Sequence, residues 1–338
     1  MKIVVLAGGK SDEHDVSMSS GSMIANALIA NGHKVLLIDL SQGVSDVNNF
    51  DEAYINYYTS HYDATISSNF VKQEGNEIGE NVLEICLTSD IVFLGLHGGI
   101  GENGQLAALF DIYGIQYTGS GYQASLLAMD KQLSKEIMRI NGLPTANWTI
   151  VSEKSDLFSI NLPAVVKPLD NGSSIGVVLV DTKDKLVQAI EETKDYTKSS
   201  KIMVEDKIEG REFSVGVLGN KGLPAIEIRP INGFYDYHNK YQKDMTEEIV
   251  PALISSELTS TLQRMAVELH NILGLDVYSR TDFIVTEDNE IYIIEINSLP
   301  GMTPQSLLPQ EAKALGLSYE ELCEKIIELS LCKYQIDG

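Results

Sequence analysis

Two β-rich runs in the last third of the chain carry side chains that could bind a divalent cation. Residues 279–297 form these runs around a polar tip at Asp288-Asn289, which is typical of an antiparallel hairpin. Because side chains alternate along a strand, one face at one end of the hairpin carries Arg280, Asp282, Glu295 and Asn297. Two carboxylates that face each other across a strand pair repel, unless a cation lies between them. Carboxylate and amide oxygens suit Mg²⁺ or Mn²⁺; an exposed strand end, with Arg280 neutralising one acid, is the alternative.

The register of this hairpin is a prediction in its own right. It pairs Asp282 with Glu295, Arg280 with Asn297, and Ile284 with Ile293. The opposite face should belong to the core, and it carries Phe283, Val285, Ile294 and Ile296. A slip of one residue would separate the polar groups, because it turns every side chain of one strand to the other face.

A glycine- and serine-rich loop forms a second candidate site. A predicted strand at 164–167 ends on Lys167, and the loop Gly172-Ser-Ser-Ile-Gly176 leads into another strand. The backbone N–H groups and hydroxyls of such a loop can hold phosphates, with Lys167 as a fixed positive charge. An ordinary flexible hairpin tip is the alternative. Residues 203–212 could offer backbone groups to an adenine and acids to a ribose, although acid-rich linkers are common.

Two loops in the first third of the chain follow predicted strands, where α/β sheets bind ligands. Residues 99–104 match the dinucleotide-binding pattern G-x-G-x-x-G, but Glu102 would place negative charge beside a pyrophosphate. In the loop at residues 8–17, Glu13 could hold a substrate ammonium, with His97 at the same sheet edge. Helix capping explains the acids of this loop equally well, and His97 could simply be a polar residue at a strand end.

The elements that would position these residues follow from hydrophobic periodicity. Strands and helices alternate in the first third, which predicts a parallel sheet covered on both faces. The predicted strands lie at 3–7, 35–38, 90–96, 164–167, 176–180 and 213–218. Helices are predicted around Met23, from about Gln105, at 122–140 and at 257–273, with two short ones at the end. Residues 232–251 read as a long polar loop, and residues 41–79 show no clear pattern.

Composition limits the class of protein. The chain has 338 residues, 43% of them hydrophobic, which suits two or three folded domains and excludes a disordered protein. A net charge of −23 disfavours binding to nucleic acid or to anionic membranes. No apolar run is long enough to cross a bilayer. The three cysteines, Cys86, Cys323 and Cys332, show no ligand spacing and fit a reducing cytoplasm.

In their order along the chain, these segments resemble the D-alanine–D-alanine ligase family of the ATP-grasp superfamily. The resemblance runs over nearly the whole chain and departs from the usual pattern only at Asn103 and Ser298. The matching segments are 7–17, 96–104, 117–121, 129–131, 166–168, 172–176, 234–241, 280–282, 295–297, 299–303 and 306–309.

The resemblance implies an α/β and α+β fold with a three-domain ATP-grasp architecture. Its domains would be a parallel α/β substrate domain at 1–119, a central subdomain with a phosphate lid at 120–205, and a subdomain with the metal site and an omega-type loop at 206–338. The implied reaction is ATP-dependent joining of two D-alanines through an acyl phosphate, for peptidoglycan precursor synthesis in the cytoplasm. D-serine as second substrate is the alternative, and a homodimer is compatible with the family.

The resemblance also assigns roles to residues. The metal ligands, for two Mg²⁺ or Mn²⁺ ions, would be Asp282, Glu295 and Asn297. ATP would contact Lys131, Lys167, Ser173, Ser174, Glu205, Ile208, Glu212 and Lys240. The amino acids would contact Glu13, His97, Tyr241, Arg280, Gly301, Ser306 and Leu307. The catalytic group would be Glu13, Ser173, Tyr241, Arg280 and Ser306, and Tyr241 points to an amine rather than D-lactate as nucleophile.

Overall fold

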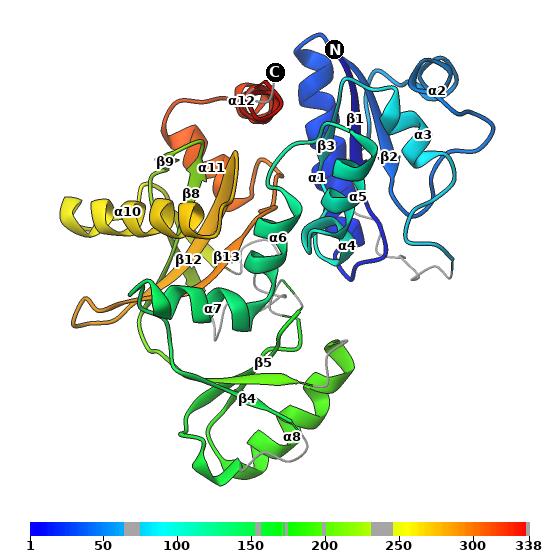
Figure 1. The fold of residues 1–338 in the computed structure, drawn as a ribbon. Helices are drawn as coiled ribbons and strands as arrows, with labels where there is room; N and C mark the ends of the chain where they lie inside the picture. The colour runs from blue at the N-terminus through cyan, green and yellow to red at the C-terminus, as the bar shows by residue number, and fades with distance from the viewer. Residues whose placement is uncertain are drawn as a thin grey trace.

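The computed structural model describes residues 1–63, 75–152, 157–170, 172, 175–197, 201–230 and 246–335. Within these residues the chain forms three β-sheets, each built from one contiguous stretch of sequence (Figure 1). The fold is mixed α/β, with one parallel and two antiparallel sheets, as the sequence predicts. Among the described residues, no helix has the length and apolarity that a membrane span requires.

The N-terminal sheet is parallel, with strand order β2-β1-β3. Its strands are β1 (Lys2–Ala7), β2 (Lys34–Asp39) and β3 (Ile91–Leu94). Residues 3–7 of β1 are all 0% exposed, although alternate side chains point to opposite faces. Both faces of the sheet are therefore covered, as predicted. The helices around it are α1 (His14–Ala30), α2 (Phe50–Tyr57), α3 (Val82–Leu87), α4 (Gly99–Glu102) and α5 (Gln105–Tyr113).

The helix α2 lies in the stretch whose structure the sequence left open. The Asn49 side chain caps it by accepting a hydrogen bond from the Glu52 N–H at 3.0 Å. Its Phe50 and Ala53 side chains are buried in the N-terminal core. Residues 64–74 of that stretch lie outside the described residues.

The single helix predicted at 122–140 is wrong, because the chain forms two helices there. They are α6 (Tyr122–Met129) and α7 (Lys131–Ile140), with Asp130 between them. The Asp130 carboxylate accepts hydrogen bonds from the backbone N–H groups of Gln132 and Leu133, each at 3.0 Å. An aspartate that caps a helix in this way satisfies amides that have no partner within the helix, and so begins a new one.

The central sheet is antiparallel, with strand order β4-β7-β5-β6. It consists of β4 (Trp148–Val151), β5 (Ala164–Pro168), β6 (Val178–Val180) and β7 (Ile202–Asp206). The helix α8 (Lys183–Thr193) packs on it through Leu186, Ala189 and Ile190. Short 3₁₀ turns at Leu157–Ser159 and Lys194–Tyr196 flank this layer.

The C-terminal sheet has the strand order β11-β10-β8-β12-β13, with β9 beside β8. Its strands are β8 (Arg211–Leu218), β9 (Lys221–Gly222), β10 (Ile226–Pro230), β11 (Thr246–Ile249), β12 (Tyr278–Val285) and β13 (Ile291–Asn297). The helix α10 (Ser256–Ile272) covers one face through Leu262, Ala266 and Leu269. The loop predicted at 232–251 is corrected at its end, where β11 pairs with β10. Residues 231–245 lie outside the described residues.

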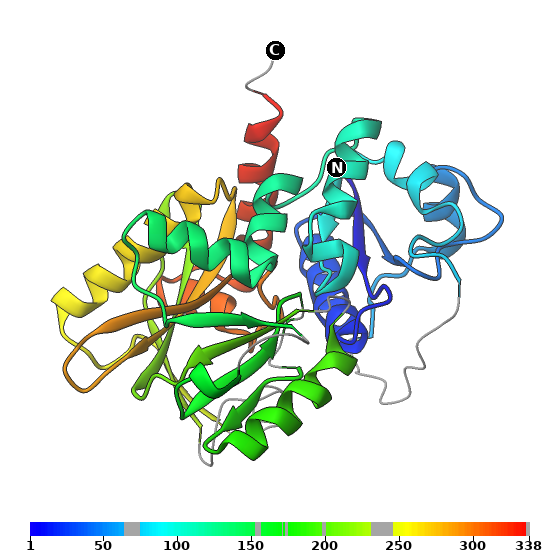
Figure 2. The ribbon, with the colours of Figure 1, turned by 60° about the horizontal axis from the view of Figure 1, so that its bottom comes forward.

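The last two helices connect the C-terminal sheet to the N-terminal domain. The helix α11 (Leu307–Ala314) packs on β8, and α12 (Tyr319–Lys333) packs on α1. In Figure 2 the red α12 lies between the C-terminal sheet and the blue N-terminal domain. Its Leu322 and Ile326 side chains are buried in the N-terminal core. The sequence predicts two short helices here, but α12 has 15 residues, and its buried side chains pack against the N-terminal domain along α1.

Candidate active site

The β12–β13 hairpin confirms the predicted register at its polar end. Arg280 pairs with Asn297, and Asp282 pairs with Glu295. Beyond Asp282 the register shifts at a β-bulge, so the predicted pairing of Ile284 with Ile293 is wrong and Ile284 pairs with Tyr292. A bulge places two residues of one strand opposite one of the other, which reverses the facing of the side chains beyond it.

The bulge also changes which isoleucine enters the core. Ile293, at 1% exposure, occupies the core together with Phe283. Ile294 was predicted for the core, but it is half-buried and lines a cavity instead. Only the part of the hairpin beyond the bulge differs from the predicted register, and the polar end keeps the predicted pairing.

A hydrogen-bond network holds the Asp282 carboxylate. The Arg280 guanidinium donates to both of its oxygens, Nε to Oδ1 at 2.9 Å and Nη2 to Oδ2 at 2.7 Å. The Ser214 hydroxyl donates to Oδ1 at 2.7 Å, and the Asn297 amide donates to Oδ2 at 3.3 Å. Across the strand pair, Glu295 lies 3.5 Å from the ammonium of Lys131. Two acids and an amide therefore share one face of the hairpin, with cations on either side.

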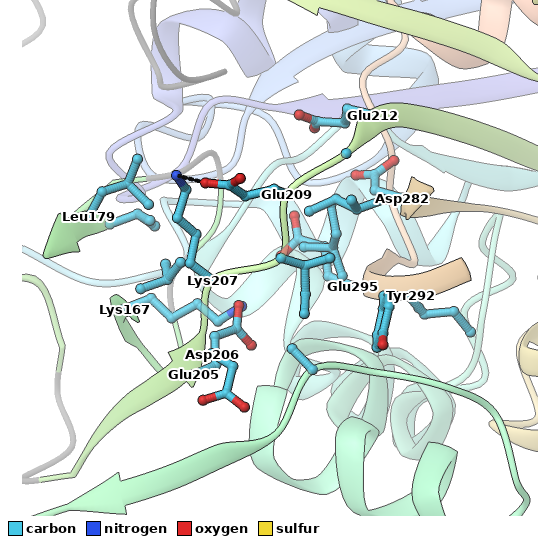
Figure 3. Close-up of a pocket in the computed structure, with 18 of the residues that line it drawn as sticks. Lys167, Leu179, Glu205, Asp206, Lys207, Glu209, Glu212, Asp282, Tyr292 and Glu295 are labelled. Carbon is cyan, nitrogen blue, oxygen red and sulfur yellow. Dashed lines mark hydrogen bonds and ion pairs between the residues drawn. The ribbon is translucent and has the colours of Figure 1, made fainter. Parts of the chain in front are cut away.

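A cavity of about 640 Å³ lies between the central and C-terminal sheets, and both acids line it (Figure 3). Its apolar wall includes Val165, Leu179, Ile208, Ile284 and Ile294. Its polar lining includes Lys131, Lys135, Lys167, Glu205, Glu212, Asp282 and Glu295. A volume in this range accommodates a nucleotide-sized ligand. The structure thus brings together predicted nucleotide contacts from both antiparallel sheets.

The buried carboxylate of Glu205 lies between two lysines in this cavity. The ammonium of Lys167 donates to Oε1 at 2.5 Å, and that of Lys135 lies 3.1 Å from Oε2. Burial alone would raise the pKa of Glu205, but the two lysines hold this pKa below its ordinary value. Burial lowers the pKa of Lys135 to about 8, in spite of the nearby Glu205 carboxylate. The carboxylate therefore stays ionised and accepts hydrogen bonds only.

The N-terminal sheet contributes a second polar group at its carboxyl edge. Glu13 and His97 are both buried there, and the His97 ring lies 3.1 Å from the Ser20 hydroxyl and 3.3 Å from the Leu299 carbonyl oxygen. Burial lowers the pKa of His97, although the neighbouring Glu13 carboxylate opposes this effect. Gly172 lies close to Glu13, since a Cβ added to this glycine would be 3.2 Å from Oε2. The start of the glycine-serine loop thus lies beside the predicted ammonium-binding acid.

The dinucleotide-binding interpretation of residues 99–104 is not supported. Residues 99–102 form the short helix α4, and its Glu102 side chain is buried. This carboxylate accepts a hydrogen bond from the Gly98 N–H at 3.0 Å, where a pyrophosphate would need donors. Burial raises the pKa of Glu102 to about 7, and the nearby Glu13 carboxylate adds to the rise.

The predicted pocket for a second amino acid lies at the start of α11. Ser306 precedes this helix, and its hydroxyl accepts a hydrogen bond from the Thr303 N–H at 3.1 Å. Gly301 lies against it, since a Cβ added to this glycine would be 2.8 Å from the Ser306 hydroxyl oxygen. The adjacent Leu307 is buried. The predicted residues Ser173, Ser174, Lys240 and Tyr241 lie outside the described residues.

Several residues of the cavity were missed by the sequence interpretation. Lys135 is the most important of them. It lies four residues after Lys131 on the same helix, and this spacing places both lysines on one helix face, which could have indicated its role. The other missed residues are Glu227, Arg229, Tyr292 and Ile294 of the cavity lining, and Ser214, which lies behind the cavity and donates a hydrogen bond to Asp282. Their positions depend on strand pairing and on the bulge, which local patterns do not reveal.

A nucleotide-sized cavity between two antiparallel sheets, with lysines and a carboxylate pair inside it, defines an ATP-grasp enzyme. Comparison with known proteins narrows this class. The model "D-ala D-ala ligase N-terminus" matches residues 2–120, and "D-ala D-ala ligase C-terminus" matches residues 137–328. The chain therefore belongs to the D-alanine–D-alanine ligase family, whose members are ATP-dependent ligases.

Curated relatives and solved structures agree with this placement. The D-alanine–D-alanine ligase of Pediococcus pentosaceus is 44% identical, over 97% of both chains. That of Halalkalibacterium halodurans is 42% identical, over 98% of this chain and 100% of the relative. The structure of the Bacillus anthracis ligase complexed with ATP has a TM-score of 0.77 at 30% identity, covering 100% of both chains. The structure of the Coxiella burnetii ligase has a TM-score of 0.78 at 26% identity, covering 99% of this chain and 95% of that one.

Proposed function

We propose that this protein uses ATP to join two D-alanine molecules into D-alanyl-D-alanine, for the synthesis of peptidoglycan precursors. The observation that carries the proposal is the facing pair Asp282 and Glu295 at the wall of the nucleotide-sized cavity. Around this pair lie an amide and two cationic side chains, Asn297, Arg280 and Lys131. This combination suits phosphoryl transfer, which depends on positioning and charge neutralisation.

The donor set fits divalent cations. Asp282 is 6% exposed, so its charge is largely removed from water, and Glu295 faces it across the strand pair. Hard oxygen donors of this kind match Mg²⁺ or Mn²⁺. Asp282, Glu295 and Asn297 would hold two such ions together with the phosphates. When bound, the ions would neutralise charge that develops on the transferred phosphoryl group.

The other cavity residues would orient the nucleotide. Lys131 on α7 and Lys167 on β5 both line the cavity, and they would contact the phosphates. Glu205 and Ile208 would contact the adenine, and Glu212 would contact the ribose. The assignment of Ser173, Ser174 and Lys240 to the phosphates rests on the sequence alone.

The chain's own residues would then guide two steps of acyl transfer. Glu13 would hold the ammonium of the first D-alanine near His97. The carboxylate of this D-alanine would then attack the γ-phosphate of ATP, which forms an acyl phosphate and releases ADP. The amine of the second D-alanine, held by Ser306 and Leu307, would attack the acyl carbon and expel phosphate. Arg280 and the Gly301 N–H would stabilise the oxyanion of that step. Ser173 and Tyr241 complete the proposed catalytic group from sequence alone.

Three further points belong to the same proposal. The domains would divide at 1–119, 120–205 and 206–338, and each sheet lies almost entirely within one of these ranges. The enzyme would work in the cytoplasm, where ATP is available and where its free cysteines would stay reduced. A homodimer is compatible with the family, and sedimentation at several protein concentrations tests for it.

Phosphate release measured with ATP, MgCl₂ and a panel of amino acids tests the proposed function. Release should require D-alanine, and the dipeptide should appear in mass spectra. D-serine paired with D-alanine should give less product than D-alanine alone. Asp282→Asn should abolish release, whereas Glu287→Gln, at the exposed hairpin tip, should not. Phosphate release without D-alanine, or an unimpaired Asp282→Asn enzyme, contradicts the proposal.

A further inference from the structure

The helix α7 presents two lysines, one turn apart, to two different carboxylates of the cavity. Lys131 lies 3.5 Å from Glu295 of the metal-binding strand pair. Lys135, one turn later, lies 3.1 Å from Glu205 on β7. Residues four apart share one helix face, so α7 runs along the cavity and connects its two acids. Lys131 thus lies at the end of the cavity where the phosphates would bind, and Lys135 lies at the other end, beside Glu205.

Lys135 is built into the protein as a charged group. Its side chain is 1% exposed, and its ammonium donates to the Thr145 hydroxyl at 2.5 Å. The same ammonium lies 5.2 Å from the centre of the Trp148 ring. A buried ammonium without partners is costly. The Thr145 hydroxyl, the Trp148 ring and the Glu205 carboxylate offset this cost, so the protein holds the Lys135 charge at this position.

The Glu205 carboxylate needs this second cation. Its Oε2 atom is buried, and the Lys135 ammonium lies 3.1 Å away and stabilises its negative charge. The other oxygen, Oε1, accepts from Lys167. In the proposed function Lys167 also serves the phosphates, and it must then divide its charge between Glu205 and the nucleotide. Lys135 has no such second duty.

We propose that Lys135 is a specificity-determining positioning residue, which keeps Glu205 a pure hydrogen-bond acceptor and thereby selects an adenine over a 6-oxopurine. The inference rests on the proposed function, in which Glu205 contacts the adenine. An ionised carboxylate accepts from the amino group at C6 of adenine. It repels the carbonyl oxygen that hypoxanthine and guanine carry at the same position. A buried site discriminates strongly against a ligand whose polar group it leaves unpaired or repels, so it should bind ATP much better than a 6-oxopurine nucleotide.

The Lys135→Met variant tests this inference, because methionine keeps the length of the stem and removes the charge. Steady-state kinetics with ATP and with inosine triphosphate, which differ at C6 and N1 of the base, give the ratio of kcat/KM for the two nucleotides. We expect this ratio to fall by about tenfold or more, which is the scale of one charged hydrogen bond. The change should lie in KM for the nucleotide, with kcat much less affected.

Arg139→Met provides the matched control. Arg139 lies on the same helix, one turn beyond Lys135, with its guanidinium carbon 3.8 Å from the centre of the same Trp148 ring. It is exposed, and the contacts described for it do not include Glu205. This variant should keep the wild-type ratio of ATP to inosine triphosphate. An equal fall in both variants would mean that the Trp148 contact is responsible, and the inference would be overturned.

A double-mutant cycle keeps the test decisive if Lys135→Met lowers stability. In a Glu205→Gln background, whose amide can also donate, Lys135→Met should cause no further change in the nucleotide ratio. An additive change would show that Lys135 acts independently of Glu205 and would overturn the inference. Failure of the proposed function is distinguishable, because the wild-type enzyme would then release no phosphate with ATP and D-alanine.

Discussion

The buried Glu102 carboxylate should make the stability of the protein fall as the pH rises through the neutral range. It is 8% exposed and accepts a hydrogen bond from the Gly98 N–H, which Glu102→Gln would preserve through the amide oxygen. Burial raises the pKa of Glu102 from 4.5 to about 7, with a further contribution from Glu13. The folded protein therefore binds this proton more tightly than the unfolded chain does.

The sign and size of the effect follow from linkage. Between pH 4.5 and 7 the unfolded chain has lost the proton that the folded protein keeps, so the free energy of unfolding decreases with pH. A difference of about 2.5 in pKa corresponds to about 3 kcal/mol, and most of this loss falls between pH 5 and pH 8. For a chain of 338 residues the loss amounts to about 3–4 °C in Tm.

Thermal unfolding of the wild type and of Glu102→Gln between pH 5 and pH 8 measures this effect. The two Tm values should be similar at pH 5, and the variant should become the more stable protein by about 3 °C at pH 8. Glu287→Gln removes an exposed carboxylate and should follow the wild-type profile throughout. Parallel profiles for wild type and Glu102→Gln would refute the reasoning, because Glu102 would then have the same pKa in both states.

Three further variants test other parts of the structure. Glu295→Gln should reduce phosphate release to below about 1% of wild type and weaken MgATP binding in calorimetry, since it removes a carboxylate from the proposed metal site. Gly216→Ala should lower the free energy of unfolding by about 1–3 kcal/mol, because its Cβ would lie 2.5 Å from Glu311 Oε2; denaturant titration checks this. Asp130→Ala should cost about 1 kcal/mol through loss of the α7 cap and raise KM for ATP by displacing Lys131, whereas Asp130→Asn should restore both.

The sequence predicted well those elements whose pattern is local. The strand β1 was visible because residues 3–7 are apolar on both faces, as a covered parallel strand must be. The break at Asp130 had a local signal as well, since aspartate is among the best residues to cap a helix. It was missed because the apolar periodicity continues across it, and periodicity alone favours one long helix.

The contacts of the cavity depend on residues far apart in the chain, and local patterns do not predict them. Glu205 meets Lys167 because β7 pairs with β5, and it meets Lys135 because that side chain reaches it from α7. The family resemblance indicates both Glu205 and Lys167 as nucleotide contacts, but it does not show that they pair with each other or that Lys135 joins them. A buried charge is tolerated only with such partners, so Glu205 alone, read from the sequence, gave no indication of its environment.

The hairpin shows why a partly wrong register still led to the right polar group. Its four polar residues lie on one side of the bulge, where the pairing of Asp282 with Glu295 is uninterrupted. The extra residue, Ile294, sits beyond that point, so the error affected only the tip and the core face. Because a bulge reverses the facing of side chains, it moves an apolar residue from the core to the cavity wall without disturbing the acids. The bulge thereby exchanges Ile293 for Ile294 beside Glu295, so the proposed cation ligands and an apolar part of the cavity wall still lie on one face of the hairpin.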